Sequence, residues 1–270
     1  MTSMKPPSSL RLLSPEPGTD PFMGLEASGA LARPGATEAV LEVSGLGASY
    51  GATPILQGVD MRIAKGEIVG LIGRNGVGKT TTMRCLIGLL RATHGSIKLQ
   101  GQDITTLSSD ARARLGIGYV PQGREVFPRM TVAENLAVGE LIGGPKGRKL
   151  LDLVYQYFPR LKDRRSQLAG TMSGGEQQQL AIGRVLIGNP ALMLLDEPSE
   201  GVQPSIVQMI CEALQSIRTE LGTTILFVEQ NLDTILAISE RCYVMEKGRT
   251  VSTIGPGEVS ADNVREHLLI

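Results

Sequence analysis

The chain has 270 residues, and 27 Lys and Arg balance 27 Asp and Glu, so its formal net charge is zero. Aromatic residues make up 3% and Trp is absent. This composition argues against a nucleic-acid binder, which needs basic surface and stacking platforms. Three scattered cysteines and two histidines form neither a disulfide framework nor a typical catalytic zinc site. No apolar run approaches the ~20 residues that cross a bilayer, so we expect a soluble chain that reaches any membrane through a partner.

The first 37 residues are rich in Pro, Ser, Gly and Ala and show no hydrophobic periodicity. Such a segment buries too little apolar surface to fold, and we expect residues 1–37 to be a disordered extension. The folded domain is therefore predicted to occupy residues 38–270.

Beyond the extension, short apolar runs alternate with helical patterns, which is typical of an α/β fold with a mostly parallel sheet and helices on both faces. Expected strands lie at residues 39–43, 59–63, 67–72, 96–100, 117–120, 191–195, 224–228, 242–245 and 250–253. Expected helices lie at residues 80–90, 149–158, 177–187 and 205–221, with one more through Ala237 and a last one running to the end. Thr131–Glu134 has the Thr-x-x-Glu spacing of a capping box and is expected to start a further helix. The first strands are predicted to form an antiparallel part of the sheet. Residues 122–172 are predicted to form an inserted helical subdomain.

One segment, Gly73–Thr80, meets every fixed position of the pattern Gly-x-x-x-x-Gly-Lys-[Ser/Thr] and joins an expected strand to an expected helix. Backbone N–H groups in such a loop point into one concavity, and the helix N-terminus adds partial positive charge, so a triphosphate fits there. Lys79 is predicted to reach the β- and γ-phosphates, and the Thr80 hydroxyl to hold Mg²⁺. The residues expected to contact the nucleotide are Gly73, Arg74, Asn75, Gly76, Val77, Gly78, Lys79, Thr80 and Thr81.

The glycines of this segment are expected to allow close backbone approach, because a Cβ at Gly76 or Gly78 would hold the ligand away. The dinucleotide pattern Gly-x-Gly-x-x-Gly is not met, which disfavours a nicotinamide cofactor. The alternative of a chance glycine turn leaves the match at all fixed positions unexplained.

Polar side chains stand where expected strands end, which is where ligands bind in α/β folds, and they include Asp196-Glu197 and Glu229-Gln230. Asp196 follows a buried apolar run and is predicted to hold Mg²⁺ opposite Thr80. Glu197 comes next and can polarise a water aimed at the γ-phosphate, as general base. Both carboxylates could instead merely cap the strand end. Gln122 follows another strand, where its amide could touch Mg²⁺ or the attacking water, or be a plain loop residue.

A second Gly-containing segment consists of Ser173, Gly174, Gly175 and Glu176. Its Ser-x-x-Glu spacing is a helix cap, and a capped helix start preceded by glycines is also an anion site. The stretch Met172–Leu180 resembles the signature sequence of ATP-binding cassette (ABC) ATPases. The resemblance covers about residues 40–270, with all the motifs in the family's order.

This resemblance implies a P-loop NTPase fold of the ABC type that uses ATP and Mg²⁺. It implies a head-to-tail dimer with a second ABC ATPase subunit, in which Ser173–Glu176 of one subunit grips the γ-phosphate bound by the other. Tyr50 matches the aromatic residue that stacks on adenine, although by itself it reads as an ordinary strand-edge tyrosine. Gln122 matches the residue that reports the nucleotide state to a membrane subunit.

Two positions depart from the family pattern. Gln203 stands where the family usually has Asp, in a loop that crosses the dimer. Gln230 stands where the family usually has His, at the γ-phosphate switch. A Gln amide can donate a hydrogen bond but does not titrate, so we expect Gln230 to contribute no pH step near ~6.5.

Within the family, Val228–Gln230 and Gln122–Pro128 resemble cassettes that serve importers of branched-chain amino acids and of urea, and Glu200–Ser205 looks closer to the urea type. The resemblance therefore implies an ATPase at the cytoplasmic face of the inner membrane. Its partners would be integral permease subunits and, indirectly, a solute-binding protein. A urea importer is the expectation, and a branched-chain amino acid importer the alternative.

Two further classes compete with this interpretation. A soluble ABC ATPase acting on nucleic acid, translation or cofactor assembly often has two cassettes, coiled-coil arms or basic surfaces, which this sequence lacks. A P-loop GTPase or small-molecule kinase would leave the Ser173–Glu176 signature unexplained, and the guanine-reading pattern Asn-Lys-x-Asp does not occur.

Overall fold

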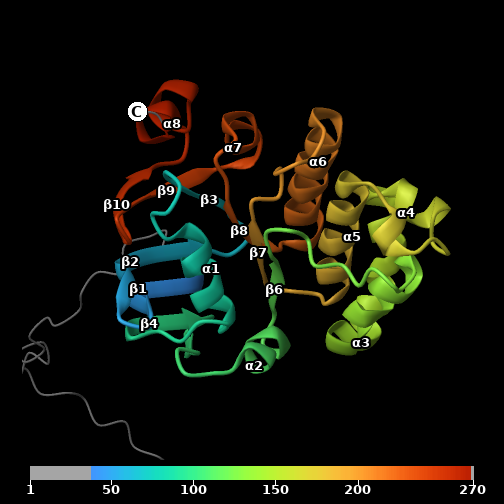
Figure 1. Ribbon diagram of the computed structural model, residues 1–270, viewed down its shortest axis with the longest axis horizontal. Coiled ribbons are helices and arrows are strands. Elements are labelled where there is room, and N and C mark those ends of the chain that lie inside the picture. Colours follow the sequence, from blue (N-terminus) through green and yellow to red (C-terminus); the bar gives the residue numbers. More distant parts are fainter. Residues whose placement is uncertain (1–37, 269–270) are drawn as a thin grey trace, which may run out of the picture. The chain divides into compact units, whose positions relative to one another are not determined.

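A computed structural model of the protein describes residues 38–268 (Figure 1). The extension expected at residues 1–37 lies outside the described part of the chain, as do residues 269–270. In the described part, ten strands form one sheet in the order β5-β4-β1-β2-β10-β9-β3-β8-β7-β6. The strands are β1 (Ala39–Tyr50), β2 (Thr53–Ala64), β3 (Ile68–Ile72), β4 (His94–Leu99), β5 (Gln102–Asp103), β6 (Ile117–Val120), β7 (Leu192–Asp196), β8 (Thr224–Val228), β9 (Arg241–Glu246) and β10 (Arg249–Ile254).

The sheet is mixed. Five neighbouring strand pairs are parallel and four are antiparallel, and the antiparallel pairs include the first strands of the chain, as expected. The parallel strands β3, β7 and β8 are buried at all five of their positions. Because successive side chains of a strand point to opposite faces, a fully apolar strand needs cover on both sides. Leu192 and Leu194 of β7 accordingly join one core cluster, and Met193 and Leu195 join the other.

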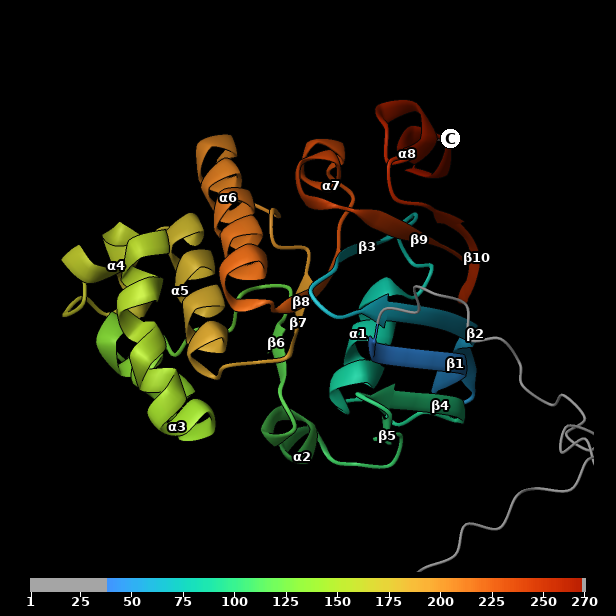
Figure 2. The ribbon, with the colours of Figure 1, turned by 180° about the vertical axis from the view of Figure 1, so that it is seen from behind.

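Helices provide this cover. They are α1 (Lys79–Ile87), α2 (Ser109–Arg114), α3 (Val132–Tyr157), α4 (Pro159–Asp163), the 3-10 turn η1 (Ala169–Thr171), α5 (Gly174–Ile187), α6 (Pro204–Leu221), α7 (Leu232–Ile238) and α8 (Ala261–Leu268). Both ribbon views show α1 beside the antiparallel strands β1, β2 and β4, and α3 beside α5 (Figures 1 and 2). Among residues 38–268, no helix combines the length and apolarity needed to cross a membrane.

Two helix boundaries differ from the expectation. The helix expected at residues 80–90 ends at Ile87, because Gly88 takes the left-handed conformation (φ 83°) and closes it. The helix expected at residues 149–158 does end before Pro159, at Tyr157, and Pro159 also opens α4, where its missing N–H costs no hydrogen bond. The helix before it, α3, already begins at Val132, after the Thr131 capping box, and is interrupted at Gly144 (φ 55°), directly before Pro145.

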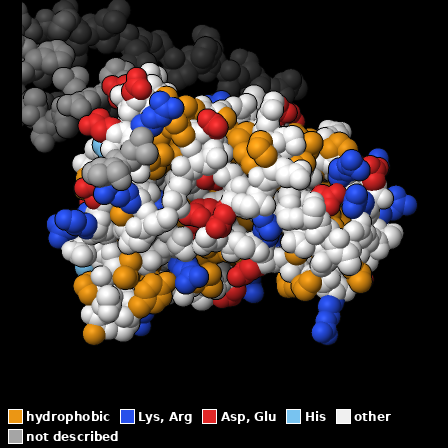
Figure 3. All heavy atoms as spheres, turned by 45° about the horizontal axis from the view of Figure 1, so that its top comes forward, with side chains coloured by type: hydrophobic (Ala, Val, Ile, Leu, Met, Phe, Trp, Pro, Cys, Tyr) orange, Lys and Arg blue, Asp and Glu red, His pale blue; other side chains and the backbone are white. Residues whose placement is uncertain are grey.

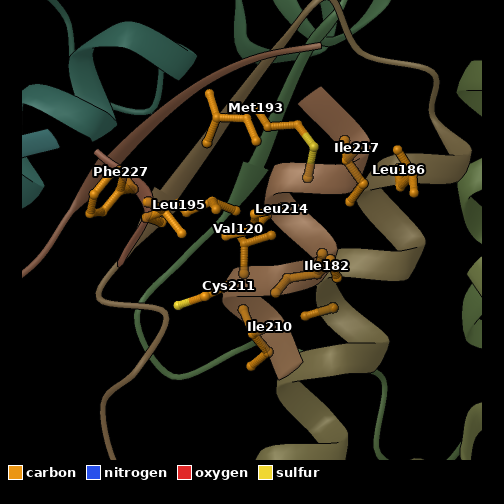
Figure 4. Packing of buried hydrophobic residues seen from close by; sticks show 14 of the residues in the cluster. Val120, Ile182, Leu186, Met193, Leu195, Ile210, Cys211, Leu214, Ile217 and Phe227 are labelled. Carbon is orange, nitrogen blue, oxygen red and sulfur yellow. The ribbon is translucent and has the colours of Figure 1, made fainter. Parts of the chain in front are cut away.

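The core on the α5 and α6 side packs these helices against the parallel strands, as Figure 4 shows. Ile182 and Leu186 of α5 and Leu214 and Ile217 of α6 are fully buried, and face β6, β7 and β8. The rigid packing of the sheet fixes the positions of the loops that follow its strands.

The carboxyl ends of β3, β6, β7 and β8 lie at one edge of the sheet, because these strands are parallel neighbours. Val120 pairs with Leu195 and Asp196 with Val228, so the residues that follow these strands emerge close together. The loops at this edge carry the polar side chains singled out in the sequence.

Candidate nucleotide-binding and hydrolysis site

The segment after β3 is a tight loop that runs into α1. Gly73, Gly76 and Gly78 all have positive φ (143°, 78° and 110°), which favours glycine. A Cβ at Gly73 would lie 2.4 Å from the carbonyl oxygen of Met245, and one at Gly78 would lie 2.7 Å from Leu56. Gly76 faces open space, so its backbone conformation, and not a contact within the chain, requires glycine there. No side chain caps the start of α1, which leaves its first N–H groups available to an anion.

Lys79 is buried at the base of this loop. Its ammonium donates hydrogen bonds to the carbonyl oxygens of Gly73 and Arg74, at 2.7 and 2.9 Å. Burial lowers the pKa of Lys79 below its ordinary value, and the neighbouring carboxylates oppose this shift. Held by two carbonyls, the ammonium stands beside the loop backbone that would surround a phosphate.

Asp196 and Thr80 lie opposite each other. The Thr80 hydroxyl donates to Oδ1 of Asp196 at 3.0 Å, and the Tyr119 hydroxyl donates to Oδ2 at 3.3 Å. Asp196 is 1% exposed. Burial raises the pKa of its carboxyl group, and the two hydroxyl donors oppose that shift. The Thr80 and Asp196 oxygens are hard donors of the kind that Mg²⁺ prefers, so this pair of residues fits a magnesium ion.

Glu197 is held by two amides. Nε2 of Gln230 donates to its Oε1 at 2.7 Å, and Nε2 of Gln122 donates to its Oε2 at 3.1 Å. The Gln122 amide also donates to Glu200, at 2.9 Å. Glu197 has φ 50° although it is not glycine, and such a conformation persists where surrounding contacts enforce it, often at functional sites.

Most of these groups line one cavity of about 460 Å³, whereas Asp196 and Tyr119 line an adjoining one that shares Thr80 and Gln122 with it. The lining of the first cavity includes Lys79 and Thr80 from the glycine loop, Gln122, Glu197 and Gln230. Figure 3 shows acidic side chains near the middle of the face that it presents, with basic ones scattered around them. The structure thus brings together the phosphate loop, the two strand-end carboxylates and the two amides that the sequence singled out.

Two predicted groups lie elsewhere. Tyr50 is half-exposed and its hydroxyl accepts a hydrogen bond from Arg84 at 3.2 Å. It lines a neighbouring cavity of about 320 Å³, which shares Thr80 and Gln122 with the first. Ser173–Glu176 begins α5 as a capping box, and the Ser173 hydroxyl donates to Glu176 at 2.8 Å. This segment does not line the Lys79 cavity of its own chain.

The structure adds one site residue that sequence reasoning missed, Arg124, and shows the contacts of Glu229. Arg124 donates to the carbonyl oxygens of Glu200 and Gly201, at 2.9 and 3.3 Å, and so joins the loop after β6 to the loop after β7. Glu229 accepts hydrogen bonds from three backbone N–H groups. Glu229 was expected at this edge, because it directly follows the buried strand β8 as Asp196 ends β7, but no role was assigned to it from the sequence.

A glycine loop that leads from a buried strand into a helix, at the carboxyl edge of parallel strands, defines a P-loop nucleoside triphosphatase. The family profile described as ABC transporter matches residues 56–200, and the chain belongs to this family. It is an ABC ATPase, in which ATP hydrolysis is coupled to transport.

Two curated relatives illustrate the range of this family. The chain is 48% identical over 203 residues to the high-affinity branched-chain amino acid transport ATP-binding protein BraG of Pseudomonas aeruginosa, covering 75% of this chain and 87% of BraG. It is 36% identical over 227 residues to the lipopolysaccharide export system ATP-binding protein LptB of Haemophilus influenzae, covering 83% and 93%.

Solved structures agree with the fold. The ADP conformation of MJ1267, an ATP-binding cassette of an ABC transporter, superposes with a TM-score of 0.74 at 28% identity, covering 85% of this chain and 96% of MJ1267. A nucleotide-free ATP-binding cassette from an ABC transporter gives a TM-score of 0.75 at 27% identity, covering 84% and 95%.

Proposed function

We propose that this chain is the ATP-hydrolysing subunit of a multisubunit importer and that Glu197 is the general base of hydrolysis. The observation that carries this proposal is the placement of the Glu197 carboxylate, which the Gln122 and Gln230 amides hold on the wall of the Lys79 cavity. A carboxylate fixed there can accept a proton from a water that attacks the γ-phosphate. The proposal is tested by the turnover of Glu197→Gln.

The loop after β3 would bind the phosphates. Its backbone N–H groups and the uncapped start of α1 offer donors to anionic oxygens. Lys79 would exchange its carbonyl partners for the β- and γ-phosphates. We assign phosphate contacts to the whole segment 73–81.

Thr80 and Asp196 would hold Mg²⁺, with the Gln122 amide oxygen as a further ligand. A magnesium ion at this place neutralises negative charge on the β- and γ-phosphates. The Tyr119 hydroxyl fixes the orientation of the Asp196 carboxylate from the other side. Tyr50 would stack on adenine, with its hydroxyl held by Arg84.

A second ATPase subunit, identical or paralogous, would complete the site. In Ser173–Glu176 the capping box occupies the N–H groups of Ser173 and Glu176, and the N–H groups of Gly174 and Gly175 are the donors that an anion would meet. This segment does not line the cavity of its own chain. In a head-to-tail dimer this segment would face the γ-phosphate bound by the other subunit. Gln203 would lie in the loop that crosses the dimer.

An apolar groove favours a membrane partner. A cavity of about 420 Å³ lies between α1, α2, α3 and α5, and its lining includes three exposed apolar side chains, Leu89, Phe127 and Ile142. Tyr119 lines it as well and also contacts Asp196, so the groove adjoins the nucleotide site. We propose that a helix of an integral permease subunit occupies this groove at the cytoplasmic face of the inner membrane.

The transported substrate is inferred from a named relative and from a sequence resemblance. BraG, at 48% identity, is named for branched-chain amino acid transport, and this relative favours branched-chain amino acids as the substrate class. Urea remains the second candidate, supported by the resemblance of Glu200–Ser205 to urea cassettes. The named relatives offer no support for urea.

Uptake of labelled leucine and labelled urea decides between these cargoes. A strain that lacks this gene is expected to lose leucine uptake and to regain it with the wild-type chain but not with Lys79→Ala. Loss of urea uptake alone would move the assignment to urea. Loss of neither, together with no detergent-dependent co-purification of a membrane protein, would favour an ABC ATPase that is not linked to these importers.

A further inference from the structure

Glu229 is a carboxylate buried at the end of β8, where it is 2% exposed. Its Oε1 accepts from the N–H of Ser199 at 2.8 Å, and its Oε2 accepts from the N–H groups of Gln230 and Asn231 at 3.0 and 3.2 Å. No salt bridge to Glu229 occurs within residues 38–268. Three backbone donors therefore stabilise its negative charge, and charge-assisted bonds of this kind are the strong ones.

These bonds join two loops that come from neighbouring strands. Ser199 lies two residues after Glu197, in the loop that follows β7, whereas Gln230 follows β8. Besides the Glu229 bond to Ser199, the N–H of Glu197 donates to the carbonyl oxygen of Val228 at 3.0 Å, and the Gln230 amide reaches the Glu197 carboxylate at 2.7 Å. Three hydrogen bonds thus join residues 197–199 to the end of β8 and to the loop after it, and Glu197 makes two of them.

We propose that Glu229 is a positioning residue for ATP hydrolysis. By holding the backbone of Gln230 and of Ser199, it fixes the distance between the two loops and so aims the Glu197 carboxylate. This inference rests on the proposed role of Glu197 as general base. Glu229 itself touches no reacting group and acts through its neighbours.

The chemistry of the side chain explains why a carboxylate stands here. Both of its oxygens accept hydrogen bonds, so one side chain serves donors on two loops. In Glu229→Gln one of the two oxygens becomes an NH₂ group, which would face a backbone N–H instead of accepting from it. In Glu229→Asp both acceptors remain, but a side chain shorter by one methylene cannot span the same gap without moving a loop.

The test compares steady-state ATPase kinetics of Glu229→Gln and Glu229→Asp with those of Glu134→Gln. Glu134 is a matched control, because its carboxylate accepts a backbone N–H bond from Thr131 at 2.7 Å at the start of α3. Both Glu229 variants are expected to lower kcat by about 10- to 100-fold, since misplacing a catalytic group by about 1 Å can cost that much. The KM for ATP should change less than about twofold, because nucleotide binding uses the loop after β3. Glu134→Gln should leave kcat intact.

A double variant separates positioning from a structural role. Measured in single turnover, Glu197→Gln/Glu229→Gln should hydrolyse ATP as slowly as Glu197→Gln, because no base remains to be aimed. If the two losses multiply, or if both Glu229 variants keep wild-type kcat, the positioning role is wrong. If Glu197 is not the general base, Glu197→Gln alone hydrolyses ATP at the normal rate. This result distinguishes failure of the general-base role of Glu197 from failure of the positioning role of Glu229. Should Glu229→Gln not fold, the more conservative Glu229→Asp carries the kcat test alone.

Discussion

Nε2 of Gln230 lies 2.7 Å from Oε1 of Glu197, and this hydrogen bond joins the loops that follow two neighbouring parallel strands. The residue expected from the ABC pattern at position 230 is His. Here an amide that does not titrate takes the same place beside the carboxylate. Several properties of the enzyme depend on this pair and on the groups around it.

Glu197→Gln is expected to cut ATP turnover by roughly 10²–10⁴-fold, the range that a general base contributes. The amide keeps the shape of the side chain, so ATP affinity should stay near that of the wild type. Turnover is measured by phosphate release and affinity by titration with a fluorescent nucleotide. Glu266→Gln, which changes an exposed glutamate on α8, serves as the control. Normal turnover in Glu197→Gln would refute the base assignment.

Gln230 should contribute no step to the pH profile of kcat/KM near ~6.5, where histidine titrates. Gln230→His should introduce such a step, because an imidazole beside the Glu197 carboxylate would gain a proton in this range. The measurement is the ATPase rate across pH 5–9 for both chains. A step near ~6.5 in the wild-type profile that vanishes in Gln230→Ala would contradict this prediction.

Lys79→Ala is expected to abolish measurable ATP binding, with a loss of about 100-fold or more in affinity, as when one partner of a buried charge pair is removed. The variant removes the buried ammonium that donates hydrogen bonds to two carbonyl oxygens of the glycine loop. Isothermal titration with ATP and Mg²⁺ measures the effect. Lys98→Ala, at an exposed lysine on β4, should bind ATP as the wild type does. Equal affinities in the two variants would remove Lys79 from the site.

Asp196→Asn is expected to raise the melting temperature at pH 7 while it abolishes hydrolysis. Burial raises the pKa of Asp196, so the folded state binds the proton more tightly than the unfolded state does. The stability linked to this group is therefore present below its ordinary pKa of ~3.9 and is lost as the pH rises through the raised value. Asparagine carries no charge to bury, and its amide oxygen can still accept from Thr80.

The pH dependence makes this prediction specific. The difference in melting temperature between Asp196→Asn and the wild type, both without nucleotide or Mg²⁺, should shrink as the pH falls towards ~4. Asp152→Asn, at an exposed position of α3, should show no comparable gain at pH 7. A lower melting temperature for Asp196→Asn at pH 7 would mean that the contacts of the carboxylate outweigh its burial.

Local patterns were enough to predict several elements. The strands at residues 117–120 and 224–228 have the expected bounds, and both Ser/Thr-x-x-Glu caps form as capping boxes. These features depend on periodicity and on contacts over three or four residues, which the order of side chains in the chain specifies directly. The expected end of a helix at Leu90 was wrong, because Gly88 closes α1, whereas the expected end of a helix before Pro159 was right, since α3 ends at Tyr157. Gly88 stands just past the end of α1 and Pro159 at the first position of α4, which are the places that these residues favour.

The residues of the nucleotide site could be predicted from their spacing in the sequence, because the glycine loop and the carboxylates after buried apolar runs occur as short motifs. The contacts between these motifs could not be predicted from sequence spacing. Glu229 and Ser199 are 30 residues apart, and Arg124 and Glu200 are 76 residues apart. Their meeting depends on the strand order β3-β8-β7-β6, which brings distant loops to one edge of the sheet. The sequence motifs thus identify the residues that bind nucleotide and act on it. The packing of the parallel strands determines which of the other groups hydrogen-bond Glu197 and at what distance.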